Sequence, residues 1–82
     1  MKLTDKWQMS MWAYEQCLDG NDTPEIRNLI TAACLAYYYC KAVKNRKEIW
    51  TKITDPGWAY LYCKYVKNKP EVRRYIKDEI NR

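Results

Sequence analysis

The chain has 82 residues, with 15 Lys and Arg against 10 Asp and Glu, a net charge of +5, four Cys, two Gly and no His. A chain of this length forms one small domain with a thin core, so we expect a single domain over residues 1–82. The missing histidine excludes Ser–His and Cys–His catalysis, and two glycines cannot build a glycine-rich phosphate loop. The composition therefore predicts a binding protein, not an enzyme, with no cofactor and no metal.

The segment from Met1 to Trp7 carries no apolar run of signal-peptide length. No stretch approaches the roughly 18 apolar residues that a membrane-spanning helix needs. We therefore expect no membrane partner and an intracellular location, where the reducing environment keeps the cysteines free.

A 23-residue internal repeat organises the chain. Residues 35–45 align with residues 58–68 and are identical at most positions, and the match extends backward to residues 12–22. Such periods are typical of repeat folds, in which each unit buries its apolar face against its neighbours. The sequence therefore predicts three copies of one unit, with the first copy, which carries Gly20, acting as a cap.

Each copy predicts two helices, at about 4–19 and 23–30, 32–44 and 46–53, and 56–67 and 69–80. The first helix of copies two and three carries apolar residues at helical spacing, namely Ala36, Tyr39, Cys40 and Val43, then Ala59, Tyr62, Cys63 and Val66. The second helix carries an i, i+4 pair in each copy, namely Ile26 with Ile30, Ile49 with Ile53, and Val72 with Ile76. The predicted fold class is all-α, with three stacked short helical hairpins in a small solenoid-like bundle.

Helix start signals fall at matching places in the copies. Asp22, Asn45 and Asn68 each precede a glutamate by three residues, which predicts a capping box with Glu25, Glu48 and Glu71. Asp55 followed by Pro56 predicts the start of the helix at 56–67.

Cysteines and tyrosines also recur with the repeat. Cys17, Cys40 and Cys63 lie on the inner stripe, where we expect them to pack as small hydrophobic residues, while Cys34 lies outside the series. Tyr14, Tyr37 and Tyr60 have two interpretations: they wedge between hairpins, or they line a binding groove.

The positive charge belongs to one half of the chain. Residues 1–40 have three basic and five acidic side chains, whereas residues 41–82 have twelve basic and five acidic ones. We expect the exposed basic and tyrosine side chains of copies two and three to form the partner-binding surface, namely Lys41, Lys44, Lys64, Lys67, Arg73, Arg74, Tyr38 and Tyr65. The alternatives are a solvated face that serves solubility, and a surface that attracts phosphate or an acidic protein. Exposed tyrosines would also favour self-association into a homo-oligomer.

The segment from Asp55 to Asn68, followed by Pro70-Glu71 and Ile76, resembles short tandem helical-hairpin repeats of uncharacterised bacteriophage and large DNA virus proteins. Cys63 stands where those repeats carry Ala, and their glycine-arginine-tryptophan turn is absent here. The resemblance implies an α-helical scaffold without catalytic residues, acting in the host cytoplasm. It suggests a small phage protein that blocks a host protein or nucleoprotein complex, such as an inhibitor of CRISPR defence. The alternatives are a nucleic-acid-binding protein that uses the basic half, and an oligomeric protein that sequesters a nucleotide signal.

Overall fold

The structure, a computed structural model, describes residues 6–76, and within this range it has six α-helices and no β-strand. The helices are α1 (Lys6–Leu18), α2 (Pro24–Arg27), α3 (Ala33–Ala42), α4 (Lys47–Trp50), α5 (Pro56–Tyr65) and α6 (Pro70–Arg73). The prediction of an all-α fold with six helices is confirmed. The parts of the predicted helices at 4–5 and 77–80 lie outside the described residues.

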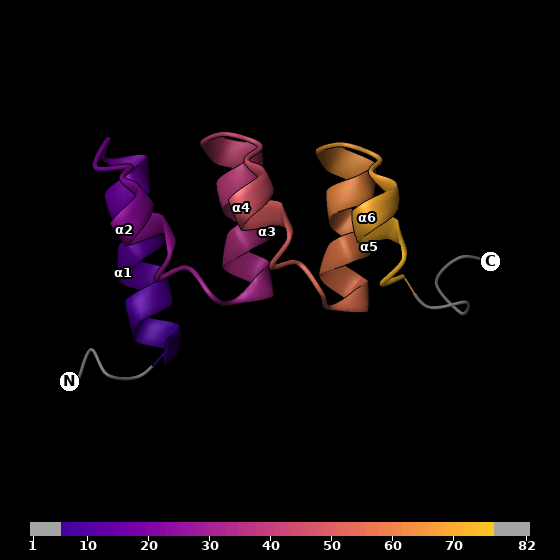
Figure 1. Cartoon of the computed structure of the whole chain (residues 1–82), viewed down its shortest axis with the longest axis horizontal. Helices are drawn as coiled ribbons and strands as arrows, with labels where there is room; N and C mark the ends of the chain where they lie inside the picture. Colours follow the sequence, from indigo (N-terminus) through magenta and orange to yellow (C-terminus); the bar gives the residue numbers. More distant parts are fainter. Residues whose placement is uncertain (1–5, 77–82) are drawn as a thin grey trace.

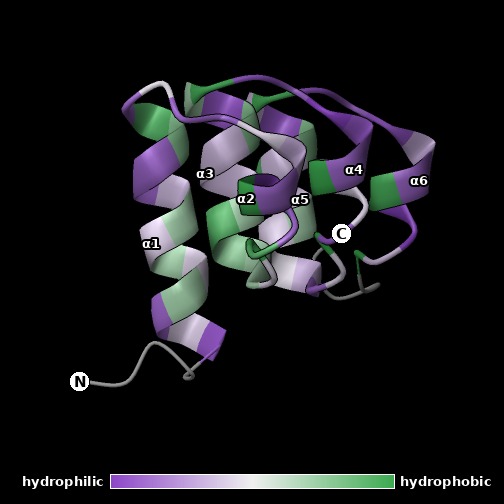
Figure 2. Cartoon of the chain, turned by 60° about the vertical axis from the view of Figure 1, so that its left-hand side comes forward, coloured by the Kyte–Doolittle hydropathy of each residue, from purple (hydrophilic) through white to green (hydrophobic). Residues whose placement is uncertain are grey.

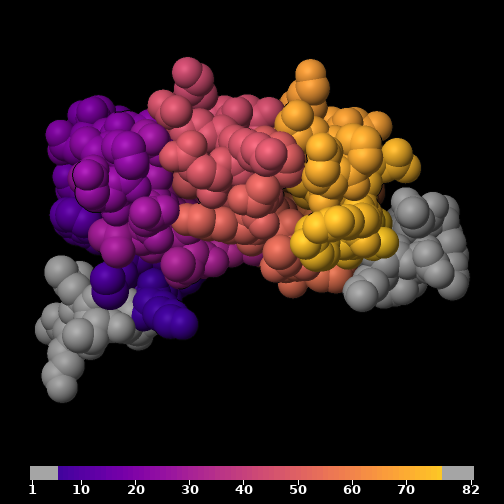
Figure 3. Space-filling view, in the orientation of Figure 1, coloured from indigo at the N-terminus to yellow at the C-terminus, as the bar shows by residue number. Residues whose placement is uncertain are grey.

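Long and short helices alternate along the chain. α1 contacts α2, α3 contacts α4, and α5 contacts α6, and we call these pairs hairpins one, two and three. The long helices also contact one another in the order α1, α3, α5, so the hairpins lie side by side in a row (Figure 1). Seen from another side, the long helices form one layer and the short helices a second (Figure 2). Hairpins one and three occupy the two ends of the body (Figure 3).

The core is built from equivalent positions of the three repeats. Ala13, Ala36 and Ala59 are each 0% exposed, because a small side chain at this position lets the helices approach closely. The buried aliphatic residues of the short-helix layer are Ile30, Ile49, Ile53 and Val72. Each contributes about 1.5–3 kcal/mol by leaving water. Cys17 and Cys40 are buried and Cys63 is half-buried, as expected for packing residues.

The short helices are shorter than predicted for 23–30, 46–53 and 69–80, and each is a single turn. After α2, the Leu29 N–H donates to the Ile26 carbonyl and the Ile30 N–H to the Arg27 carbonyl, both at 3.0 Å. These i to i−3 bonds wind the chain more tightly than an α-helix. The tighter turn directs the Ile30 side chain into the core. A continued α-helix would point the same side chain in another direction.

The predicted capping boxes are wrong at their first residue. The residues that cap the short helices are Thr23, Arg46 and Lys69, and of these only Thr23 accepts a backbone hydrogen bond through its side chain. Asp22 and Asn45 are instead hydrogen-bond acceptors for the neighbouring hairpin. The predicted start of α5 is confirmed, because the Asp55 carboxylate accepts from the N–H groups of Gly57 and Trp58.

Polar side chains also tie hairpin one to hairpin two. The Ser10 hydroxyl, which is fully buried, accepts from the N–H groups of Thr31 (3.0 Å) and Ala32 (3.3 Å) in the linker between them. Lys52 Nζ donates to the carbonyls of Arg27 (3.1 Å) and Ile30 (2.6 Å). The Ile30 carbonyl, beyond the end of α2, thereby gains a donor, and the Arg27 carbonyl, which already accepts from the Ile30 N–H, gains a second one.

Candidate partner-binding surface

Three of the predicted binding residues meet on the long-helix layer. Tyr65, which is 56% exposed, lies between two ammonium groups, with Lys41 Nζ at 5.5 Å and Lys64 Nζ at 5.4 Å from its ring centroid. Lys41 also lies 5.8 Å from the Tyr37 ring, and Lys64 lies 5.7 Å from the Tyr60 ring. A cation over the face of an aromatic ring is attracted by the ring, so these contacts favour positions of the ammonium groups near the tyrosines.

The charge on Lys64 is secure at neutral pH. Tyr60, and after it Tyr65, raise the pKa of Lys64 above its ordinary value. We call the group formed by Lys41, Lys64 and Tyr65 the basic tyrosine cluster. It presents two fixed positive charges and one exposed ring.

An aromatic cluster connects this group to the other end of α3 and α5. The Trp58 ring lies 5.5 Å from that of Tyr37 and 5.7 Å from that of Tyr38, which is 42% exposed. Tyr37 itself is only 4% exposed and lies beneath Lys41. Tyr37 therefore wedges between hairpins two and three, while its counterpart Tyr60 is 38% exposed.

The aromatic cluster borders an apolar hollow of about 440 Å³. Two strongly exposed apolar side chains, Trp7 (51%) and Met11 (38%), form one of its walls. The lining residues come from α1, α3 and α5 and are Trp7, Met11, Tyr14, Cys34, Leu35, Tyr38 and Trp58. Of these, Tyr38 was among the binding residues predicted from the sequence, and Tyr14 was one of the tyrosines for which a position in a binding groove was the alternative. For Trp7, the signal that could have indicated this position is the additional N-terminal turn of α1, which places Trp7 before the start of the repeat.

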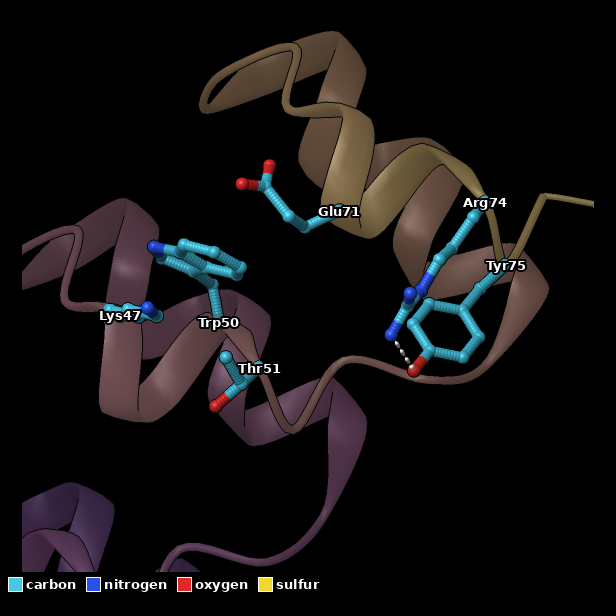
Figure 4. A pocket seen from close by; sticks show the side chains of 6 residues that line it. All are labelled: Lys47, Trp50, Thr51, Glu71, Arg74 and Tyr75. Carbon is cyan, nitrogen blue, oxygen red and sulfur yellow. Dashed lines mark hydrogen bonds between the residues drawn. The ribbon is translucent and has the colours of Figure 1, made fainter.

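The other predicted binding residues lie elsewhere. Lys44 and Lys67 are exposed just after the ends of α3 and α5. Arg73 lines a separate hollow of about 220 Å³ at the outer side of hairpin three. Arg74 lies over the Tyr75 ring at 5.3 Å and lines a hollow of about 160 Å³ between α4 and α6, with Glu71 on its own side and Trp50 opposite (Figure 4).

The polar cluster with the shortest contacts is structural. Asp22 accepts from the Tyr39 hydroxyl (2.7 Å) and from Arg27 Nη1 (2.8 Å), while Arg27 Nε donates to Glu48 (2.6 Å). Burial acts to raise the pKa of Asp22, but the hydrogen bonds from Tyr39 and Arg27 outweigh it and lower the pKa below its ordinary value. Among residues 6–76, every buried side-chain nitrogen and oxygen has a hydrogen-bond partner.

The repeated cysteines are not activated. Burial raises the pKa of Cys17 to about 11 and that of Cys40 to about 12, so both are protonated thiols at neutral pH. Within the described part of the chain, no group of three or more His, Cys, Asp or Glu residues could hold a metal ion. No helix in this range is long and apolar enough to span a membrane.

Comparison of the chain with known protein-family models, with curated proteins and with solved structures finds no match.

Proposed function

We propose that this protein is a non-catalytic binding protein that captures an acidic protein surface through its long-helix layer. The observation that carries the proposal is the continuity of two features on that layer. The apolar hollow meets the aromatic rings of Tyr38 and Trp58, and these lead through Tyr37 to Lys41 and the basic tyrosine cluster. An apolar centre with a charged rim is the usual anatomy of a protein interface.

The hollow favours a protein partner over nucleic acid. Trp7 and Met11 line the apolar hollow, which an aliphatic or aromatic side chain of the partner can fill. A nucleic acid would instead need cations along its whole path, because each phosphate carries a charge. On this surface, Lys41 and Lys64 supply such cations at one end.

The resemblance to repeats of phage and large DNA virus proteins supports a host target. We accordingly propose a stoichiometric inhibitor that blocks a host protein or nucleoprotein complex, with the CRISPR effector complexes as the first candidates. The role of the lysines is to select an acidic region of that target and to speed the encounter with it.

The test compares capture by the full-length protein and by two charge-reversed variants. Lys41→Glu with Lys64→Glu removes the basic tyrosine cluster, whereas Lys6→Glu with Lys47→Glu makes the same charge change away from it. Each tagged protein is incubated with a host lysate, with and without nuclease, and bound proteins are quantified by mass spectrometry. We expect a host protein that the wild type and the control capture equally and that the cluster variant loses at least about tenfold.

Two outcomes would contradict the proposal. One is equal capture by the cluster variant. The other is capture that nuclease abolishes, together with binding of a single-stranded oligonucleotide that weakens steeply with salt, which would support the nucleic-acid alternative. The exposed Tyr65 ring between two ammonium groups makes that alternative chemically reasonable, since bases stack on such rings.

A further inference from the structure

The boundaries between hairpins use a small set of contacts at fixed repeat positions. Between hairpins two and three, the Trp58 ring packs on Tyr37 at 5.5 Å, the Tyr62 hydroxyl donates to Asn45 Oδ1 at 2.6 Å, and the Tyr65 ring lies 5.5 Å from Lys41 Nζ. Residues 58, 62 and 65 form one face of α5, and they meet residues 37, 41 and 45 of hairpin two. These three contacts define how hairpin three packs against hairpin two.

The boundary between hairpins one and two follows the same rule. The Tyr39 hydroxyl, at the position equivalent to Tyr62, donates to Asp22 at 2.7 Å. In the short-helix layer, Arg27 Nε of hairpin one donates to Glu48 of hairpin two at 2.6 Å. Each hairpin therefore has a receiving side, which faces the next hairpin, and an inserting side, which faces the previous one.

The receiving side of hairpin three is open within the described structure. Tyr60, Lys64, Asn68 and Arg73, which are equivalent to Tyr37, Lys41, Asn45 and Trp50, line the hollow of about 220 Å³ at this end. Tyr60 is 38% exposed, whereas Tyr37, which hairpin three covers, is 4% exposed. Asn68 has no side-chain hydrogen bond with any described residue, although its counterparts Asp22 and Asn45 both accept one.

The inserting side of hairpin one is open as well. Trp12, equivalent to Trp58, is 39% exposed. Gln16 stands where hairpins two and three carry Tyr39 and Tyr62, and among residues 6–76 its side chain bonds only to the exposed Asn21 of its own hairpin. Asp19 and Glu25, at the positions of Tyr65 and Glu48, are both exposed.

We propose that the open receiving side of one copy binds the inserting side of a second copy, so that the stack of hairpins continues head to tail from chain to chain. Carrying the internal geometry across this boundary pairs each open residue with a complementary one. Trp12 of the second copy packs on Tyr60 as Trp58 packs on Tyr37, and Glu25 meets Arg73 as Glu48 meets Arg27. At the position of Tyr65 the second copy brings Asp19 to Lys64, and Gln16 faces Asn68.

The charges of the two ends support this pairing. The inserting side of hairpin one carries Asp19 and Glu25, and the receiving side of hairpin three carries Lys64 and Arg73. Unlike charges would therefore face each other in a head-to-tail contact, while head-to-head or tail-to-tail contacts would oppose like charges. Because one side of a chain binds a different side of the next, the assembly is heterologous and grows by addition of copies unless it closes into a ring.

The self-association does not depend on the proposed host target. At the internal boundary Lys41 and Tyr65 both remain exposed. Lys64 would keep its exposure in the same way, so the assembly would lengthen the basic row and leave it accessible.

The test uses charge-swapped full-length chains in sedimentation velocity over a range of concentrations. Variant N carries Asp19→Lys and Glu25→Lys, and variant C carries Lys64→Glu and Arg73→Glu. A control with Lys44→Glu and Lys47→Glu makes the same charge change as variant C away from both ends. We expect the wild type and the control to self-associate with concentration, and each swapped variant alone to bind about a hundredfold more weakly.

An equimolar mixture of variants N and C restores unlike charges at every boundary, so we expect it to assemble again. This recovery also rules out misfolding as the cause of the losses. The proposal is overturned if the wild type stays monomeric up to about 1 mM, since that corresponds to only about 4 kcal/mol of binding. It is also overturned if only one of the two variants loses association, which indicates a symmetric contact, or if the mixture does not recover.

Discussion

The Tyr62 hydroxyl donates a 2.6 Å hydrogen bond to Asn45 Oδ1, seventeen residues earlier in the chain, and thereby joins hairpin three to hairpin two. The same spacing separates Tyr39 from Asp22 at the preceding boundary. A fully buried tyrosine thus reaches across each boundary to a short polar residue in the loop of the previous hairpin. This contact gives a role to the tyrosine on the first helix of hairpins two and three and to the Asp or Asn before the second helix of the preceding hairpin.

The two boundary tyrosines should differ in their contribution to stability. Tyr62→Phe removes a bond to a neutral and exposed acceptor, for which we expect a loss of about 0.5–1.5 kcal/mol in the free energy of unfolding. Tyr39→Phe removes a bond to the Asp22 carboxylate and leaves Arg46 Nε without its 2.8 Å acceptor, so we expect about 1.5–3 kcal/mol. Chemical denaturation followed by circular dichroism measures both, with Tyr65→Phe as the exposed control. Equal losses for the two variants would contradict the role given to Asp22.

Acid should weaken the protein through Asp22. The pKa of Asp22 in the folded protein lies below its ordinary value of 3.8, so its contribution is fully present above that value and is lost as the pH falls through the folded pKa. We expect the free energy of unfolding to fall below about pH 4 in the wild type, and this part of the decline to be absent in Asp22→Asn. Identical acid profiles for the two proteins would argue against a hydrogen-bonded, ionised Asp22.

Alkali should weaken it through the boundary tyrosines. Burial raises the pKa of both Tyr39 and Tyr62 to about 12 from an ordinary 10.0. A raised pKa means that the folded state favours the neutral phenol, so this stabilisation is intact below pH 10 and is lost as the pH rises toward 12. Titration of tyrosine absorbance should show two tyrosines that ionise only with unfolding. Ionisation of Tyr39 and Tyr62 near pH 10, before unfolding, would contradict the burial of these hydroxyls.

The cysteines should react with alkylating reagents in a fixed order. Cys34 lines the apolar hollow, whereas Cys17 and Cys40 are buried thiols whose pKa values are raised to about 11 and about 12. We expect Cys34 to be modified first at neutral pH, by about tenfold or more, because the thiolate is the reactive form. Peptide mass spectrometry identifies the modified residue. Earlier modification of Cys17 would contradict either the burial of Cys17 or the position of Cys34 in the apolar hollow.

A single substitution should strengthen the head-to-tail contact. Gln16→Tyr gives hairpin one the tyrosine that hairpins two and three use, so its hydroxyl can reach Asn68 of another copy. One additional hydrogen bond of about 0.5–1.5 kcal/mol corresponds to roughly a twofold to thirteenfold tighter association. Sedimentation velocity measures the gain, and Asn68→Ala in the same chain should cancel it. A gain that survives Asn68→Ala would place the new tyrosine elsewhere.

The 23-residue period was sufficient to predict the six helices and most of the core, although not the lengths of the short helices. The recurrence of Ala36 and Ala59, and of Ile30 and Ile53, follows the 23-residue period, and these residues are fully buried. The period specifies which residues are equivalent and hence which faces pack, so the all-α class followed from the sequence.

The capping boxes failed because the pattern is local and the competing partner is distant. Asp22 and Glu25 have the correct spacing for a cap, but the Tyr39 hydroxyl from the next hairpin and the Arg27 guanidinium both reach the Asp22 carboxylate. Hydrogen bonds from a buried phenol and a buried cation are stronger than one from an exposed backbone N–H. The sequence spacing alone does not show which of these hydrogen bonds to Asp22 is the stronger.

The apolar hollow was not predicted, because it too depends on contacts between distant parts of the chain. Trp7 and Met11 lie on α1, and the hollow forms only where α1 meets Tyr38 of α3 and Trp58 of α5. The basic residues were easier to identify, because Lys41 and Lys64 recur at one repeat position. Their grouping around Tyr65 required the packing of α3 against α5, since Lys41 and Tyr65 belong to different hairpins.

Photo-crosslinking from defined positions shows whether the long-helix layer captures a host protein. A photoreactive amino acid replaces Tyr38, which is exposed between the apolar hollow and the basic tyrosine cluster, or Asn28, which is exposed in the short-helix layer. After irradiation in a host lysate, we expect one host protein to crosslink to position 38 and not to position 28, and the crosslink to persist after nuclease treatment. Equal crosslinking from both positions, or crosslinking from position 28 alone, would show that the long-helix layer is not the surface that captures the host protein.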